Sequence, residues 1–493
     1  MDLPSPLPGL ALAPAALALP LIVLSRRRPA VRETWSVLAS VLQTALVLAM
    51  LPAVRDGARL VWAPASLAPG VPLALRADAL GVFFATVASA LWVLTTIYSI
   101  GYTRALDERA QTRYFGAFAL CLFSTVGLAL AENLLTFFLF YELLTVATYP
   151  LVIHKQTHAA VLAGRLYLAY TLTGGAALLG AVAWTYALAG RLDFAPGGIL
   201  GGAAAPPAAL WALFVLFALG FGVKAAVVPL HTWLPVAMIA PTPVSALLHA
   251  VAVVKAGVFG FLRLVGFVFG PGLLDDLGAA TALAALGGAT ILLGSLAALA
   301  QDDLKRLLAF STVSQLSYIL LGAALGTPEA FTGGVLHMAT HAVLKITLFF
   351  CAGAIYVTAH LERVSQLDGI GRRMPLTMAA FAVAAFMLAG LPPGAAFVSK
   401  WRLLVGAAEA GAWIAVGVFL VSTLLNVAYF APIVLRAFAG GGGPRVAMAE
   451  ARPAVLVPLL ITAAAGVVLG LQPEAGHLLG LARAVTADVM GAP

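Results

Sequence analysis

The chain has 493 residues, of which 62% are hydrophobic and 10% are charged, with a formal net charge of +8. A soluble domain carries about a quarter charged residues, so this composition, with a mean hydropathy of +1.02, excludes a soluble globular protein. The basic balance reflects a bias of Lys and Arg toward one side of a membrane and indicates no nucleic-acid partner.

Apolar runs repeat along the chain, and a run of about 20 residues crosses a bilayer core as a helix. These runs are longer than the roughly ten-residue strands of a membrane barrel. The sequence therefore predicts an all-α integral membrane protein, one polytopic domain over 1–493, with about fourteen transmembrane helices. The predicted spans are 8–25, 36–54, 78–100, 113–130, 132–152, 162–189, 208–229, 243–268, 279–299, 303–325, 328–357, 375–408, 411–437 and 453–472.

Lys and Arg residues outside the spans are distributed unequally. Most of them fall in the loops after odd-numbered spans, and few fall in the opposite loops: Arg55, Arg59, Arg76, Arg191, Arg263 and Arg483. Because positively charged loops stay in the cytoplasm, we expect both termini on the outer face of the cell's inner (plasma) membrane.

No motif indicates a cofactor. Cys121 and Cys351 both fall in predicted spans and form no CxxC pair, so we expect no iron–sulfur or zinc site. No GxxxxGK[ST] or GxGxxG motif opens a helix, so we expect no nucleotide site. We therefore expect no cofactor, no metal and no catalytic residue, and redox chemistry or ATP hydrolysis would have to come from a partner.

Glu142, in FLFYELLTVATYP, lies near the middle of the fifth predicted span. An ionisable residue at that depth is costly, and it marks a candidate functional site. The alternative is an ion pair that only locks helices together.

Four lysines also lie within predicted spans: Lys224, Lys255, Lys345 and Lys400. A single lysine could extend its side chain to the membrane surface. Four lysines with one glutamate are better explained by a hydrated interior. Burial disfavours the charged form of a lysine and a nearby carboxylate restores it, so such a lysine can hold or release a proton.

Histidines extend this set. His337, His341 and Lys345 are spaced i, i+4 and i+8, which places them on one helix face. His249 lies six residues before Lys255. The alternatives are core histidines with satisfied hydrogen bonds, or a metal site at His337 and His341, which lacks an obvious third ligand.

Prolines interrupt two predicted spans. Pro229 and Pro235 follow Lys224, and Pro392 and Pro393 precede Lys400. Proline ends a helix, and the freed backbone is tolerated in a membrane only where it lines a cavity or is buried in protein. Two broken helices, each with a lysine, are typical of transporter repeats, although each proline alone could be a packing kink.

The sequence resembles the antiporter-like subunits shared by respiratory complex I, Mrp-type Na+/H+ antiporters and membrane-bound hydrogenases. The motifs that carry this resemblance are IYSIGYTR at 97–104, LFYELLT around Glu142, KAAVVPLHTWLPVAMIAPTPVSALLHAVAVVKAGVF at 224–259, QDDLKRLLAFSTVSQLSY at 301–318, HMATHAVLKITLFF at 337–350 and LAGLPPGAAFVSKW at 388–401.

The resemblance implies two inverted five-helix repeats, spans 4–8 (113–268) and 9–13 (279–437), each with a broken helix. It implies that Glu142 and Lys224 form a coupled pair and that Lys400 is the terminal site toward the outside. The residues implied for the central relay are Lys255, His249, His337, His341 and Lys345.

The resemblance also implies hydrophobic partner subunits in a lipid bilayer, with H+ and possibly Na+ as the transported ions. Lys400 argues against an M-type subunit, and the length leaves no room for the lateral helix of L-type subunits, so the Mrp D subunit fits best. An N-type or hydrogenase subunit is the alternative. A stand-alone solute transporter is disfavoured because every arginine except Arg402 sits at a loop or span end, and a passive scaffold would not retain the buried ionisable groups.

Overall fold

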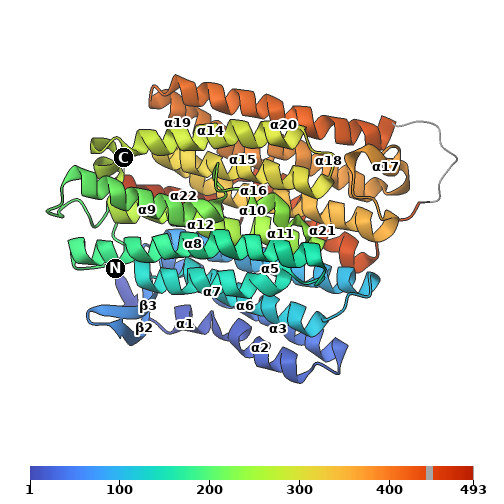
Figure 1. The fold of residues 1–493 in the computed structure, drawn as a ribbon, viewed down its shortest axis with the longest axis horizontal. Coiled ribbons are helices and arrows are strands. Elements are labelled where there is room, and N and C mark those ends of the chain that lie inside the picture. Colours follow the sequence, from blue (N-terminus) through green and yellow to red (C-terminus); the bar gives the residue numbers. More distant parts are fainter. Residues whose placement is uncertain (440–447, 492–493) are drawn as a thin grey trace.

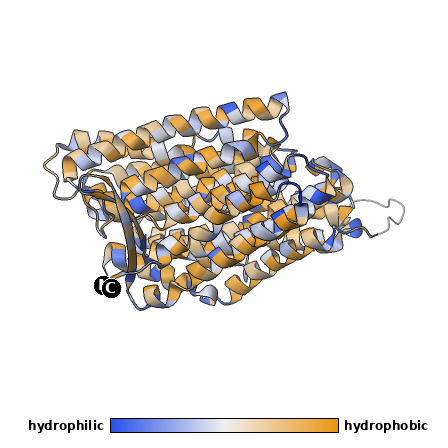
Figure 2. Ribbon diagram, turned by 90° about the horizontal axis from the view of Figure 1, so that it is seen from below, coloured by the Kyte–Doolittle hydropathy of each residue, from blue (hydrophilic) through white to orange (hydrophobic). Residues whose placement is uncertain are grey.

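The computed structural model describes residues 1–439 and 448–491 as a bundle of long helices lying side by side (Figure 1). Among these residues, 13 helices are long and apolar enough to cross a membrane. Hydrophobic residues cover most of their length, and hydrophilic residues gather at the two ends of the bundle (Figure 2). The predicted fold class, a multi-pass helical membrane protein, is confirmed.

Up to residue 263 the helices are α1 (Leu7–Leu10), α2 (Ala13–Leu24), α3 (Pro29–Leu48), α4 (Leu51–Arg55), α5 (Ala79–Ala105), α6 (Gln111–Ala129), α7 (Leu134–Val152), α8 (His158–Ala189), α9 (Pro207–Ala225), α10 (Trp233–Val236), α11 (Thr242–Ala250) and α12 (Val253–Arg263). They are followed by the π-helical segment η2 (Leu264–Phe269), α13 (Pro271–Asp276), α14 (Ala279–Leu299), α15 (Leu304–Ala324), α16 (Pro328–Ala359), α17 (Ile370–Arg373), α18 (Pro375–Ala389), α19 (Ala395–Glu409), α20 (Trp413–Ala439), α21 (Pro453–Leu471) and α22 (Leu478–Met490).

A small sheet, which the sequence analysis did not predict, lies at the end of the bundle that also holds both ends of the described chain (Figure 1). Its strands β1 (Asp2–Pro4), β2 (Arg59–Ala68) and β3 (Val71–Ala77) are ordered β1-β2-β3. β1 runs parallel to β2, and β3 pairs with β2 in the antiparallel direction. We call this end of the bundle the sheet end.

Two helices stop where proline requires it. α9 ends at Ala225, four residues before Pro229, and α18 ends at Ala389, four residues before Pro393. The proline ring clashes with the carbonyl four positions earlier and offers no N–H to it, which favours an end at that residue, whereas α2, α7, α20 and α21 continue through Pro20, Pro150, Pro432 and Pro458. The predicted span 375–408 is thus two helices, α18 and α19, and this broken crossing together with the 13 long helices agrees with the predicted number of spans. Whether 113–268 and 279–437 are inverted repeats remains a prediction.

The eighth predicted span, 243–268, is not one continuous helix. It consists of α11, α12 and η2, with a break at Val251 and Ala252, whose ψ angles are −49° and −89°. Neither proline nor glycine marks this break, so the sequence pattern gave no sign of it. Its consequence is that His249 and Lys255 lie on separate helices rather than on one.

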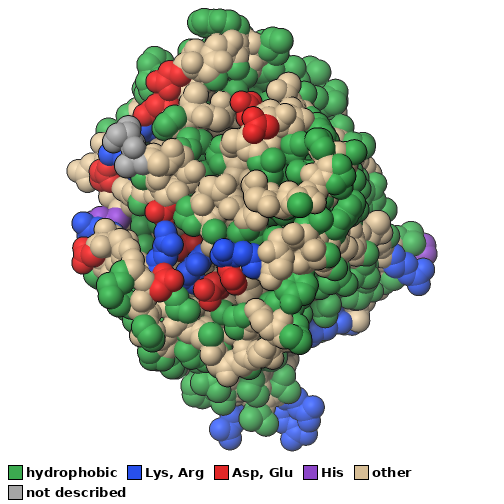
Figure 3. Space-filling view, turned by 90° about the vertical axis from the view of Figure 1, so that its left-hand side faces the viewer, with side chains coloured by type: hydrophobic (Ala, Val, Ile, Leu, Met, Phe, Trp, Pro, Cys, Tyr) green, Lys and Arg blue, Asp and Glu red, His purple; other side chains and the backbone are tan. Residues whose placement is uncertain are grey.

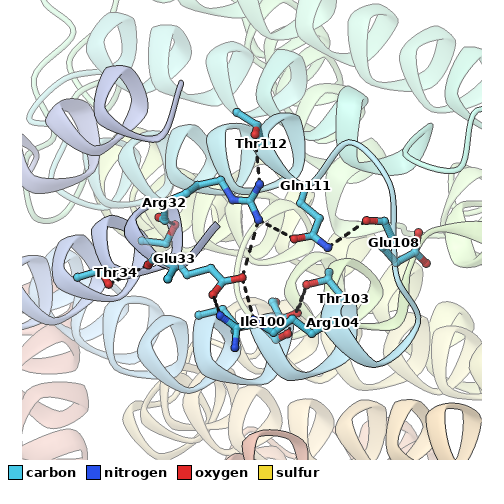
Figure 4. A network of polar contacts seen from close by, with 12 residues as sticks. Arg32, Glu33, Thr34, Ile100, Thr103, Arg104, Glu108, Gln111 and Thr112 are labelled. Carbon is cyan, nitrogen blue, oxygen red and sulfur yellow. Dashed lines mark hydrogen bonds and ion pairs between the residues drawn. The ribbon is translucent and has the colours of Figure 1, made fainter. Parts of the chain in front are cut away.

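The end of the bundle opposite the sheet is tied together by polar contacts (Figure 4). Arg32 of α3 donates to Gln111 (2.6 Å) and Thr112 (3.3 Å) of α6. Glu33 of α3 forms an ion pair with Arg104 of α5. These contacts join α3, α5 and α6, so the helices before the predicted repeats are anchored to them.

Gly257 allows α12 to touch the end of α9. A Cβ atom at this position would overlap the backbone of Ala225. We expect Gly257→Ala to lower the free energy of unfolding by about 1–3 kcal/mol, because overpacking forces backbone shifts. Thermal unfolding of the purified protein measures this. Gly417→Ala is the matched control, since a Cβ atom there meets nothing within 4 Å; an equal loss in both variants would contradict the close contact.

Candidate functional site

Glu142 and Lys224 meet where α9 ends. The Lys224 Nζ lies 3.8 Å from the Glu142 Oε1, which is a charge contact rather than a hydrogen bond. The lysine is fully buried. Its ammonium donates to the Tyr141 carbonyl and lies 3.3 Å from the centre of the Tyr141 ring. The lysine therefore has one neutral acceptor, one aromatic face and one charged neighbour.

Gly175 of α8 makes room for the Glu142 carboxylate. A Cβ atom on Gly175 would lie 2.6 Å from the Glu142 carboxyl carbon. The Glu142 Oε1 is buried and has no hydrogen-bond partner in the described part of the chain. The carboxylate is therefore held by shape and by the lysine's charge, which leaves its position sensitive to nearby charges.

Lys255 and His341 form the next close pair. The Lys255 Nζ lies 2.6 Å from the His341 Nδ1, joining the first turn of α12 to the middle of α16. Both side chains are almost completely buried. The other ring nitrogen of His341 has no partner within the described residues. A lysine and an imidazole at hydrogen-bond distance can exchange a proton directly.

His337 connects α16 to α19. Its Nδ1 lies 2.9 Å from the Ser399 Oγ, and its Nε2 lies 3.1 Å from the Gln315 Oε1. The His337 and His341 rings are 6.2 Å apart, centre to centre. Both nitrogens of His337 are thus used by neutral partners, and Ser399 places this histidine next to Lys400 in the chain.

Lys400 lies at the second helix break. Its ammonium donates to the carbonyl of Ala389, the last residue of α18, at 3.2 Å. It also lies 4.8 Å from the centre of the Tyr318 ring, which stacks on the His337 ring at 5.3 Å. The proline break thus supplies a free carbonyl that Lys400 occupies.

Within the described part of the chain, Lys345 makes no hydrogen bond to the two histidines with which it was expected to form a relay. It shares a helix face with the two histidines, but its ammonium donates to Ser311 (2.9 Å) and to the Leu308 carbonyl (3.3 Å) of α15. Ser311 in turn contacts the Tyr429 hydroxyl at 2.9 Å, which donates to Asn426 of α20. Among the described residues Lys345 makes no hydrogen bond to His341, so it begins a side branch toward α20.

His249 stands apart from the other polar groups. Neither of its ring nitrogens has a hydrogen-bond partner in the described part of the chain. Its ring lies 5.0 Å from that of Phe349. The break between α11 and α12 places it on a different helix from Lys255, and within the described residues no hydrogen bond joins the two.

The polar side chains therefore fall into separate groups: Glu142 with Lys224, Lys255 with His341, His337 with Ser399 near Lys400, and Lys345 with its branch. Within the described residues no hydrogen bond joins Lys224 to Lys255. A proton could cross these gaps only by side-chain movement or through intervening water.

The sequence analysis missed several polar residues in these contacts. Ser422, Asn426 and Tyr429 are buried at i, i+4 and i+7 of α20, a spacing that the sequence does show. The analysis also misplaced Arg263, which is not at a loop but lies buried inside the span Thr242–Phe269, in an ion pair with Asp78.

Comparison with known proteins identifies the family of the segment that carries these residues. Residues 131–426 match the family model described as NADH:quinone oxidoreductase/Mrp antiporter, transmembrane. The chain belongs to this family.

Similarity to individual proteins supports the same family assignment. The NADH-quinone oxidoreductase subunit N of Desulforudis audaxviator is 35% identical over 77% of this chain and 78% of the relative. Hydrogenase-4 component B of Escherichia coli is 33% identical over 67% of this chain and only 50% of that longer relative. A chain in the structure of the Mrp complex from Dietzia sp. DQ12-45-1b superimposes with a TM-score of 0.87 at 26% identity, covering 98% of this chain and 97% of the other.

The resemblance that the motifs indicated is thus confirmed. The chain is an antiporter-like subunit of the Mrp, NADH-quinone oxidoreductase and hydrogenase group, and a multi-pass membrane protein. Its structural relatives belong to multi-subunit membrane complexes, consistent with hydrophobic partner subunits.

Gly175→Ala provides a test of the Glu142 position in this antiporter-like subunit. The added methyl group must displace the carboxylate, so we expect proton-coupled transport in reconstituted vesicles to fall several-fold while the complex still assembles. Gly180→Ala, on the same helix with open space around it, is the control and should transport normally. Equal transport by both variants would show that the placement of Glu142 does not matter.

Proposed function

We propose that this chain is the proton-translocating subunit of a multi-subunit cation/proton antiporter of the Mrp type. The observation that carries the proposal is the buried contact of Lys224 with Glu142 at the end of α9. A lysine held in the membrane beside a single carboxylate can change its protonation when that carboxylate moves. The likeness to a chain of an Mrp complex over nearly the whole length supports this assignment.

In the proposed mechanism Glu142 acts as the switch. When the carboxylate is close, it stabilises the charged form of Lys224. When a charge change in a neighbouring subunit draws it away, Lys224 gives up its proton toward Lys255 and His341. A change of one pKa unit corresponds to about 1.4 kcal/mol, so a swing of a few pKa units at Lys224 would be enough to drive transfer.

The later steps use the contacts of α16. From His341 the proton passes to His337 and leaves by way of Lys400, which sits at the break between α18 and α19. Lys345, which is linked through Ser311 to Tyr429, holds a proton beside this route without being part of it. We assign His249 a role in supplying Lys255, although within the described residues no hydrogen bond joins them.

The proposed location is the plasma membrane, with both termini on the outer face and the sheet end facing outward. The unequal distribution of Lys and Arg between the two sets of loops supports this orientation. We also propose that 113–268 and 279–437 are inverted repeats, because the breaks that follow α9 and α18 stand in the same relation to a proline.

The second candidate is a proton-pumping subunit of an NADH-quinone oxidoreductase or a membrane-bound hydrogenase. The similarity to a subunit N over more than three quarters of both chains favours it. The residues of the path would be the same, and only the source of energy would differ.

Purification of the native complex in mild detergent decides between the two candidates. The Mrp proposal predicts that only small hydrophobic subunits co-migrate, without flavin or iron. Flavin or iron–sulfur subunits in the complex would instead establish the pump, because this chain shows no cofactor motif of its own.

Substitution of the switch pair tests the mechanism in either complex. We expect Glu142→Gln and Lys224→Ala each to abolish coupled proton transport in proteoliposomes, since neither variant can shift charge between the two residues. Glu474→Gln, an exposed carboxylate at 57% side-chain exposure, is the control for a lost negative charge. Full transport by an assembled Glu142→Gln complex would refute the role of the pair.

A further inference from the structure

Arg263 is a buried cation that the proton path does not use. It ends α12, two turns beyond Lys255 on the same helix face. Its side chain is 1% exposed and donates two hydrogen bonds to Asp78, at 2.5 and 2.8 Å. Asp78 also accepts from the Gly81 N–H at 2.8 Å, so the carboxylate is fixed to the first turn of α5.

Aromatic rings surround the guanidinium. Its central carbon lies 4.9 Å from the Phe194 ring, 5.2 Å from Phe259 and 4.9 Å from Phe267. These contacts favour the cation and fill the space around the ion pair with apolar groups. We call Arg263, Asp78 and these three rings the plug.

The loops of the sheet end are bonded together above the plug. Arg76 donates to the Phe194 carbonyl at 2.5 Å and lies 3.8 Å from Glu132. The loop after α8 pairs with η2 through the Gly197 N–H and the Gly266 carbonyl, at 3.0 Å. Figure 3 shows this end face, with acidic and basic side chains gathered near its centre. These contacts join β3, the loop after α8 and η2 at the sheet end.

The second half differs at the same end. Arg402, two residues after Lys400, pairs with Glu329 at 2.8 Å, but their side chains are 18% and 38% exposed. The connection between α18 and α19 next to Lys400 interrupts this crossing part-way along the bundle, and Leu391 within it is 45% exposed on the bundle's surface. A partly exposed ion pair without surrounding rings does not form a barrier comparable to the plug.

We propose that the plug is a fixed-charge barrier that prevents protons and hydrated cations from leaving Lys255 toward the sheet end. A guanidinium does not deprotonate in proteins, so Arg263 cannot pass a proton on. The proton on Lys255 is therefore directed sideways to His341 and leaves only near Lys400. This inference rests on the proposed proton path.

Stability alone does not explain the plug. A buried ion pair is often no more stable than a neutral pair of similar volume. The double variant Asp78→Asn with Arg263→Gln keeps hydrogen-bonding groups at both positions without the charges, so it leaves no unpaired buried charge. It separates the barrier from the structural role of these residues.

The measurement is passive proton leak. The native complex is reconstituted in vesicles, a potassium diffusion potential is applied without any driving ion gradient or electron donor, and an enclosed pH dye is followed. We expect the D78N/R263Q complex to leak protons several-fold faster than wild type. The matched control E474Q/R483Q neutralises an exposed pair with 57% and 56% side-chain exposure and should leak no faster than wild type.

A second variant covers the case in which D78N/R263Q does not assemble. Phe194→Ala removes one ring and leaves the ion pair intact, and we expect a smaller rise in leak. An assembled variant of either kind that leaks like wild type would overturn the barrier. If the plug variants leak like wild type and Glu142→Gln is inactive, the barrier proposal is wrong but the proposed switch stands. If a plug variant leaks and Glu142→Gln is fully active, the proposed switch is wrong but the barrier stands.

Discussion

The buried lysines impose the main constraint on this bundle, because a cation in the membrane interior must find an acceptor on a neighbouring helix. Lys224 uses the Tyr141 carbonyl of α7, Lys255 uses His341 of α16, and Lys400 uses the Ala389 carbonyl of α18. Leaving a buried polar group without its hydrogen-bond partner costs about 1–3 kcal/mol, and more for a charged group. The same contacts that place helices side by side therefore also place groups that can hold a proton.

The helix breaks supply part of this chemistry. A broken helix exposes backbone groups that lipid cannot satisfy. At the end of α18 the free Ala389 carbonyl is taken by Lys400, and near the end of α9 the Val223 carbonyl accepts from the Trp233 indole at 2.8 Å. One break thus binds a titratable group directly, while the other is closed by an aromatic side chain beside Lys224. Both breaks are stabilised by specific side chains and are not simple interruptions.

The two ion pairs nearest the sheet end of α12 and α19 differ in their burial. Arg263 and Asp78 are buried, paired in bidentate fashion and lie among three phenylalanines, whereas Arg402 and Glu329 are partly exposed. The barrier that we propose at Arg263 would give the proposed path a direction, which two equivalent halves would lack.

Three features were predictable from the amino-acid sequence: that the chain crosses a membrane, about how many times it does so, and that helices break near Pro229 and Pro393. Each follows from properties of short segments: hydrophobicity over a span, and the clash of proline with the carbonyl four residues earlier. The buried ionisable residues were also recognisable, since a charge within an apolar run is conspicuous.

The partners of these residues were decided only by the tertiary structure. The periodicity of α16 placed His337, His341 and Lys345 on one face, but the neighbouring helices direct Lys345 to Ser311 and His341 to Lys255. The break at Val251 and Ala252 and the burial of Arg263 were equally hidden. Neither is encoded by a local backbone preference; both depend on which helices pack against α12, and that is a property of the whole bundle.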